Sequence, residues 1–226
     1  MIPIADSVKA KRFPIFNIGI IILTVFVFYL QITSPESFTY QYALIPSQID
    51  FANFSTLYPF VTSIFLHGGF LHIISNMIFL WVFGDNVEGH FPFLTYPFLY
   101  IGSGIVASLA QYIISPASNI PMLGASGAVA GALGAYFVLF PHHKIKTFVP
   151  FFGFFTMVNI SAVFMLGYWF VLQILSGAAS LSGPSDIGGV AFWAHVGGFV
   201  FGAAAAKLLD LFKHEEQHTD HAELSP

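Results

Sequence analysis

Residues 126–141 read SGAVAGALGAYFVLFP, a short apolar run in which glycine or alanine returns at every fourth position. Gly127, Gly131 and Ala135 therefore share one face of the predicted helix, because residues four apart lie about one turn from each other. Such a face lets membrane helices approach closely. The run at 190–211 carries Gly198 and Gly202 at the same spacing. These two runs are predicted to pack together inside a helical membrane protein.

The composition of the whole chain agrees with a membrane protein. Of its 226 residues, 56% are hydrophobic and only 8% are charged, too few charges for a water-soluble surface. The mean hydropathy is +0.78. The chain has no cysteine, which excludes disulfides, thiolate metal sites and a cysteine nucleophile.

The apolar runs predict an all-α polytopic membrane protein with six transmembrane helices. The predicted spans are 14–32, 65–84, 93–114, 126–141, 150–176 and 190–211. With six crossings, all 7 Lys and Arg residues fall on one side, which is therefore cytoplasmic. We thus expect a cytoplasmic N-terminal segment at 1–13, a six-helix domain at 14–211 whose first helix is retained, and a polar, disordered cytoplasmic tail at 212–226.

Polar side chains within spans are costly, so those present are candidates for function. They are His72 and Asn76 in the second span, Ser126 at the start of the fourth and His195 in the sixth. Counted from the cytoplasmic border at about 1.5 Å per residue, they share one depth. The fourth span starts there and is too short to cross, so residues 116–125 are predicted to line a wet pocket inside the membrane.

These residue types favour acyl-transfer chemistry. A neutral imidazole can take the proton of a serine hydroxyl, and His195 can serve Ser126 in this way if the fourth and sixth helices are close. No acidic residue lies between Glu88 and Asp186, so we expect a Ser-His dyad. The backbone N–H of Ser126, with His72 and Asn76, would stabilise an oxyanion.

Plainer interpretations exist for each residue alone. A serine at a helix start is usually a cap, and intramembrane His and Asn often only hydrogen-bond between helices. A metal site is disfavoured because this layer offers two histidines, whereas zinc takes three or four protein ligands. A transporter or channel would need polar groups through the full depth. We expect His67 to be a structural hydrogen-bonding residue.

Two other groups of residues are expected to lie outside the site. His142 and His143 are predicted to be solvated on the cytoplasmic side. The aromatic stretch 148–170 is predicted to face lipid, with an interfacial belt of aromatic side chains.

Four motifs in order resemble those of rhomboid intramembrane serine proteases. They are HGGFLHIISN at 67–76, GDNVE at 84–88, GASG at 124–127 and AHVGG at 194–198, and the resemblance covers about residues 40–210. It implies a six-helix rhomboid core with Ser126 as nucleophile, His195 as base, and His72 and Asn76 at the oxyanion. It implies transmembrane protein substrates, admitted between the second and fifth helices and cut near their outer ends, without cofactor, metal or nucleic acid. Inactive relatives bind membrane proteins without cutting them, which is the alternative function.

The chain departs from this family pattern in two places. Residues 33–64 contain no Trp-Arg pair, which many members carry in the first loop. Ala130 stands where many members have a tyrosine that stacks beneath the histidine, so another residue must support His195. By analogy, 177–189 would be a mobile cap and the aromatic part of the fifth helix a lateral gate. The expected location is the plasma membrane of a prokaryote, with both termini cytoplasmic.

Overall fold

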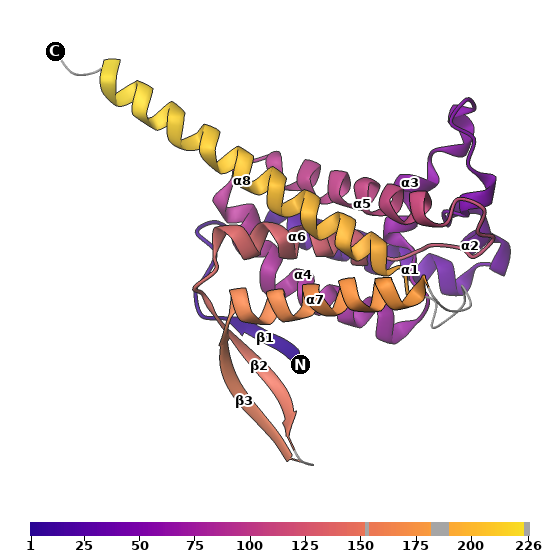
Figure 1. Cartoon of the computed structure of the whole chain (residues 1–226), viewed down its shortest axis with the longest axis horizontal. Coiled ribbons are helices and arrows are strands. Elements are labelled where there is room, and N and C mark those ends of the chain that lie inside the picture. Colours follow the sequence, from indigo (N-terminus) through magenta and orange to yellow (C-terminus); the bar gives the residue numbers. More distant parts are fainter. Residues whose placement is uncertain (152–153, 182–189, 224–226) are drawn as a thin grey trace.

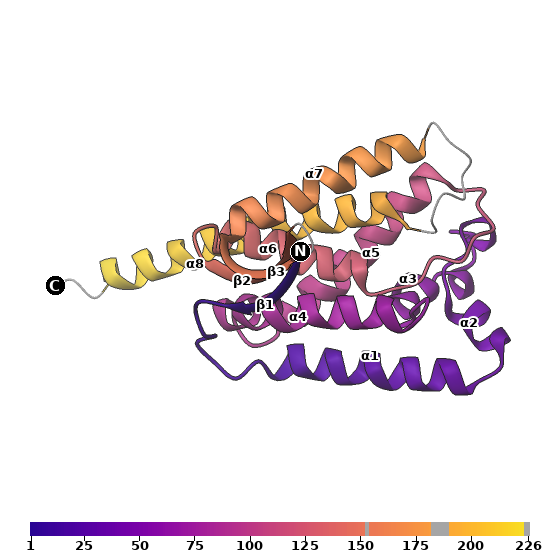
Figure 2. The ribbon, with the colours of Figure 1, turned by 90° about the horizontal axis from the view of Figure 1, so that it is seen from below.

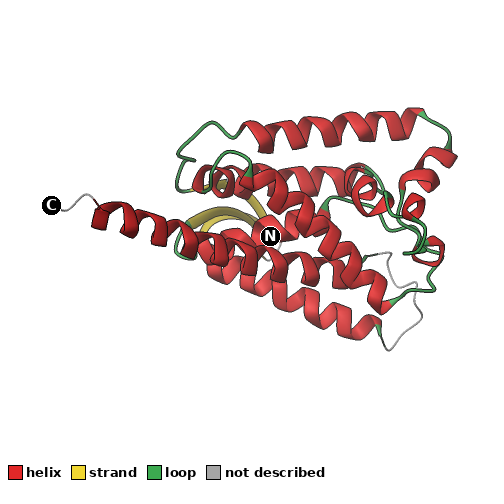
Figure 3. Ribbon diagram, turned by 90° about the horizontal axis from the view of Figure 1, so that it is seen from above, coloured by secondary structure: helices red, strands yellow, loops and turns green. Residues whose placement is uncertain are grey.

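The computed structural model describes residues 1–151, 154–181 and 190–223, and these form a helical bundle with three strands at one end (Figures 1 and 3). In chain order the elements are β1 (Ile2–Asp6), α1 (Ile15–Thr33), α2 (Glu36–Tyr42), α3 (Pro59–Thr62), α4 (Phe70–His90), α5 (Thr95–Ile114), α6 (Ser126–Leu139), β2 (Lys144–Phe151), β3 (Phe154–Ser161), α7 (Ala162–Ser180) and α8 (Phe192–Glu223). Short 3₁₀ turns lie at Pro46–Gln48, Phe54–Thr56 and Ser63–Phe65.

Six helices match the predicted spans. Among the described residues, five are long and apolar enough to cross a bilayer: α1, α4, α5, α7 and the first part of α8, Phe192–Phe212. The sixth, α6, has 14 residues, or about 21 Å of rise, against a hydrocarbon core of about 30 Å. The predicted six-helix membrane fold is confirmed, as is the short fourth helix.

Helix α6 occupies the middle of the bundle, and most of its residues from 126 to 135 are glycine or alanine, which lets its neighbours approach closely. Each residue from Gly127 to Tyr136 is buried, and the helix packs against α4, α5, α7 and α8. Helix α1 instead lies at the margin against α4, with α7 on the other side of the bundle (Figure 2). The start of α6 is therefore enclosed by other helices.

The irregular backbone before α6 is held by hydrogen bonds to the first loop. Leu44 and Met122 form an isolated antiparallel bridge, and the N–H of Gly124 donates to the carbonyl of Ser63 over 2.9 Å. Backbone at membrane depth needs such partners, because no water is available in the hydrocarbon core.

The predicted fifth span is wrong in its first part. Residues 144–161, except 152–153, form two antiparallel strands, and β1 adds to β2 in the order β1-β2-β3 (Figure 1). In β2, Ile145 and Thr147 are fully buried while Lys144 and Lys146 are exposed, the period of two expected for a strand. The many aromatic residues of this stretch make the alternation of buried and exposed residues hard to recognise in the sequence.

The C-terminal prediction also needs correction, because α8 runs to Glu223 where a disordered tail was expected. The predicted cap at 177–189 begins with the last turn of α7. Its residues 182–189, which include Asp186, lie outside the described residues.

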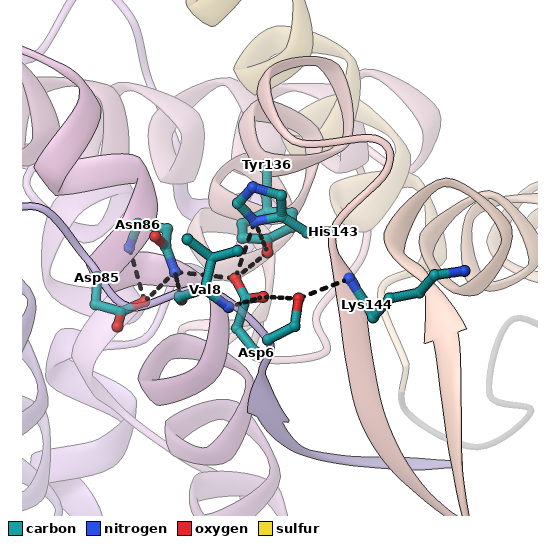
Figure 4. Close-up of polar contacts among 8 residues, drawn as sticks. Asp6, Val8, Asp85, Asn86, Tyr136, His143 and Lys144 are labelled. Carbon is teal, nitrogen blue, oxygen red and sulfur yellow. Dashed lines mark hydrogen bonds and ion pairs between the residues drawn. The ribbon is translucent and has the colours of Figure 1, made fainter.

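A polar cluster ties the N-terminal strand to the end of α6 (Figure 4). Asp6 accepts hydrogen bonds from the hydroxyl of Tyr136 and, over 2.9 Å, from Nδ2 of Asn86. The carboxylate also lies 3.3 Å from Nδ1 of His143. His143 is therefore only partly exposed and has a carboxylate neighbour, whereas His142 is exposed as expected.

Candidate active site

Ser126 and His195 meet at the centre of the bundle. Ser126 is the first residue of α6, and His195 lies in the first turn of α8. Serine Oγ is 2.8 Å from Nε2 of the imidazole, which is hydrogen-bonding distance. The two residues are 69 positions apart in sequence, and the structure brings their side chains into contact.

Glycines make this approach possible. A Cβ on Gly198 would lie 2.1 Å from the carbonyl oxygen of Gly127, and one on Gly202 would lie 2.0 Å from that of Gly131. Each distance is far below van der Waals contact, so α6 and α8 touch through their backbones at these positions. The predicted packing of the two glycine faces is confirmed.

Two residues of α7 support the far side of the imidazole, and neither was predicted. Nδ1 of His195 lies 2.7 Å from Oε1 of Gln173. The ring of Trp169 packs against the imidazole in a tilted arrangement, with centroids 5.8 Å apart and planes inclined at 37°. Trp169 was expected to face lipid, which is wrong, whereas Phe164 and Tyr168 are exposed. Helix α7 thus provides the support that Ala130 cannot.

One sequence signal could have identified Gln173. A strongly polar amide within an apolar span is as costly as the histidine and asparagine that were singled out, and it needs a partner. Trp169 carries no such signal, because an aromatic residue in a membrane helix most often faces lipid or the interface.

His72 and Asn76 lie beside the serine but make different contacts. Gly124 has a φ of 128°, and a Cβ there would lie 2.8 Å from Nε2 of His72, so this ring lies directly against the backbone that precedes Ser126. Asn76 Nδ2 lies 3.1 Å from Nε2 of His67. The predicted oxyanion residues are therefore both near the start of α6.

His67 is a structural residue, as expected, but it is part of the site's wall. It is 1% exposed, and its Nε2 accepts a hydrogen bond from the N–H of Ala125 over 3.4 Å. Burial, assisted by the neighbouring His72, lowers the pKa of His67 to about 4, so the ring is neutral at physiological pH. A neutral ring with Nε2 as acceptor orients the Asn76 amide.

These side chains face one hollow of about 1510 Å³, which reaches the loops at the end of the bundle. Its lining includes Ser126, His195, His72, Asn76 and Trp169. Residues 114–123 also contribute, in agreement with the predicted pocket along 116–125. Within the described ranges, no three His, Cys, Asp or Glu side chains are placed to hold a metal ion.

Comparison with known proteins agrees with this architecture. The family model described as "Rhomboid domain" matches residues 55–210. The chain is 32% identical over 153 residues to "Rhomboid protease GluP" of Bacillus subtilis (strain 168), covering 68% of this chain and 26% of that protein. It is 33% identical over 87 residues to "Putative rhomboid protease YdcA" of the same organism, covering 38% and 43%. It is 38% identical over 93 residues to "Rhomboid protein 1, mitochondrial" of Saccharomyces cerevisiae (strain ATCC 204508 / S288c), covering 39% and 27%.

In each of these three relatives the match spans less than half of the relative's length. The family model, however, covers most of this chain. The matched residues include Ser126, His195 and their neighbours on α4, α6, α7 and α8. The chain belongs to the rhomboid family.

Proposed function

We propose that this protein is an intramembrane serine endopeptidase that cleaves transmembrane segments of other membrane proteins near their outer ends. The observation that carries the proposal is the 2.8 Å contact between Ser126 Oγ and His195 Nε2 within the bundle. A serine activated by a neighbouring imidazole performs acyl transfer, and a similar protein of the same family is named a rhomboid protease.

The proposed reaction has two halves. His195 Nε2 takes the proton of Ser126 as Oγ attacks the scissile carbonyl carbon, and the same proton then passes to the departing amine. The acyl-enzyme is released when His195 takes a proton from water, whose hydroxide attacks the ester carbon, and returns that proton to Ser126 Oγ. No cofactor or metal takes part in these steps.

The oxyanion needs donors that are in place before attack. We assign this role to the backbone N–H of Ser126, which as the first residue of α6 has no carbonyl within its own helix to bond. Asn76 can add its second amide hydrogen, since His67 engages Nδ2 from one side only. His72 adds a side chain against the same backbone segment.

Substrate access follows from the lining of the hollow. Phe79 and Ser75 of α4 and Trp169 of α7 contribute to it, which supports admission of a substrate helix between α4 and α7. A separate recess of about 30 Å³ borders Ser126 and is lined mostly by small residues, among them Gly104, Ala107 and Ala128. The residue whose carbonyl is attacked should therefore have a small side chain.

We further propose that both termini, residues 1–13 and 212–226, are cytoplasmic, and that the membrane is the plasma membrane of a prokaryote. Lys144 and Lys146 lie on β2, which pairs with β1 near the N-terminus, so these basic residues gather at one end of the bundle. Retention of basic residues on the cytoplasmic side then sets the orientation.

The test is to reconstitute the protein with a panel of single-pass membrane proteins and to map cleavage by mass spectrometry. Wild type should cut after a small residue near the outer end of a transmembrane segment, and Ser126→Ala should not. Ser103→Ala is the matched control, because Ser103 is a buried serine of α5 whose Oγ donates to the carbonyl of Leu99. Failure of wild type to cut any member of the panel, or of a fluorophosphonate to label Ser126, would favour a binding protein of the same fold.

A further inference from the structure

The two ring nitrogens of His195 have partners on two different helices. Nε2 faces Ser126 on α6 at 2.8 Å, and Nδ1 faces Gln173 on α7 at 2.7 Å. An imidazole can act as a base toward the serine only if Nε2 carries a lone pair, which requires the proton of the neutral ring to be on Nδ1. Whatever accepts a hydrogen bond from Nδ1–H therefore decides whether His195 can act.

The orientation of the Gln173 amide is set by a second contact. Its Nε2 donates to the backbone carbonyl of Trp169 over 3.4 Å. A carbonyl oxygen can only accept, so the amide nitrogen belongs on that side and Oε1 is left facing His195. With the amide reversed, its nitrogen would donate to Nδ1, the ring proton would move to Nε2, and the lone pair toward Ser126 would be lost.

Trp169 restricts the same ring from its face. Its indole lies 5.8 Å from the imidazole centroid at 37° and is four residues, about one turn, before Gln173 on α7. One helix thus supplies both an in-plane acceptor and a packing surface, which together oppose rotation of the imidazole away from Ser126.

We propose that Gln173 is a positioning residue that holds His195 in the Nδ1–H tautomer, the role that a carboxylate has in a three-residue serine-protease site. The described carboxylates that pair with histidines serve elsewhere, Asp6 with His143 and Asp210 with His90. A neutral amide orients the ring as a carboxylate does but adds no charge to stabilise the imidazolium. This inference rests on the proposed function.

Fluorophosphonate labelling of Ser126 in the full-length protein, measured as a second-order rate constant against pH, tests the inference without a known substrate. Gln173→Leu keeps a similar volume and removes the acceptor, so labelling should slow about tenfold, the scale of one neutral hydrogen bond. Gln173→Glu restores an acceptor and adds charge, so it should label faster than Gln173→Leu. The rise of its rate with pH should also move to higher pH than in wild type, because the charge favours the imidazolium.

The titratable side chains that line the same hollow as His195 include His67 and His72. Helices α6 and α7 present Ser126, Gln173 and Trp169 to the ring. A double variant with His72→Gln should retain the shift caused by Gln173→Glu, since that shift arises from α7.

Nitrogen-15 NMR of labelled histidine gives a readout independent of activity. The His195 signals, assigned by their loss in His195→Ala, should show a proton on Nδ1 in wild type and a mixture of tautomers in Gln173→Leu. Ile174→Leu, an exposed neighbour on α7, is the control for small changes in this helix and should match wild type.

The outcomes separate the two proposals. Wild type that is not labelled at Ser126 would overturn the proposed function and this inference with it. Wild type that is labelled, together with a folded Gln173→Leu of the same rate, pH profile and tautomer, would overturn this inference alone. If Gln173→Leu fails to fold, a wild-type ring with its proton on Nε2, or a Gln173→Glu profile identical to wild type, would overturn it equally.

Discussion

The distance between α6 and α8 is set by glycines, and Gly198→Ala should change it by a calculable amount. The added Cβ would lie 2.1 Å from the carbonyl oxygen of Gly127, whereas a close carbon–oxygen contact is about 3.3 Å. The helices must therefore separate by roughly 1 Å at this position. Ser126 precedes Gly127 and His195 lies one turn before Gly198, so most of this shift reaches the Ser126–His195 pair.

A shift of this size breaks the contact between Ser126 and His195. The 2.8 Å distance from Oγ to Nε2 would become about 3.8 Å, which is beyond a hydrogen bond. Misplacement of a reacting group by about 1 Å costs on the order of 100-fold in rate. We expect kcat/KM for cleavage of a transmembrane substrate to fall by about that factor in Gly198→Ala, with a lower thermal unfolding temperature.

The matched control is Gly19→Ala on α1, where an added Cβ would meet nothing within 4 Å. Both variants make the same chemical change in a helix, so the intrinsic preference for alanine cancels in the comparison. The assay is cleavage kinetics in proteoliposomes, normalised to the folded fraction. A rate for Gly198→Ala within twofold of the rate for Gly19→Ala would refute the claim that backbone contact between α6 and α8 sets the distance between Ser126 and His195.

Three further predictions concern residues around the site and at the other end of α6. Gly124→Ala places a Cβ 2.6 Å from a ring carbon of His72 at a φ of 128°, so cleavage should fall about 100-fold or more, and activity close to wild type would show that this backbone can move freely. Tyr136→Phe removes the hydroxyl that donates to Asp6, so the unfolding free energy should fall by about 1–3 kcal/mol while cleavage per folded molecule stays within about threefold; a variant as stable as wild type in thermal unfolding would contradict this. The pKa of His67 in the folded protein is about 4, below the ordinary 6.5, so between these pH values the unfolded chain binds a proton that the folded protein does not. The free energy of unfolding should therefore fall by up to about 3 kcal/mol as the pH drops from 6.5 to 4. An equal fall in His67→Gln would assign it to other groups.

The sequence alone was sufficient for the membrane class and most of the helices. Runs of about twenty apolar residues have few alternatives to a transmembrane helix, and the long spans agree with the structure within a few residues at most of their ends. It failed at 154–161, where the strand β3 was joined to the helix that follows. Apolar content does not distinguish the two, and the short alternation in β2 was the remaining signal.

The sequence was also sufficient to identify Ser126 and His195 as candidate residues. Ser126 and His195 were identified because a polar group in a span is costly, and because glycine spacing on two runs implied that their helices touch. The distance between them was not available from spacing, since helix contacts fix depth and rotation only when the bundle is assembled.

Only the tertiary structure determined which side chains surround the imidazole of His195. Periodicity shows which residues share a face of one helix, but which face meets which neighbour depends on how each helix is rotated in the bundle. That rotation turns Gln173 and Trp169 of α7 toward His195 and brings His67 against Asn76. The sequence thus identified the candidate residues Ser126 and His195, and packing between helices determined which side chains orient them.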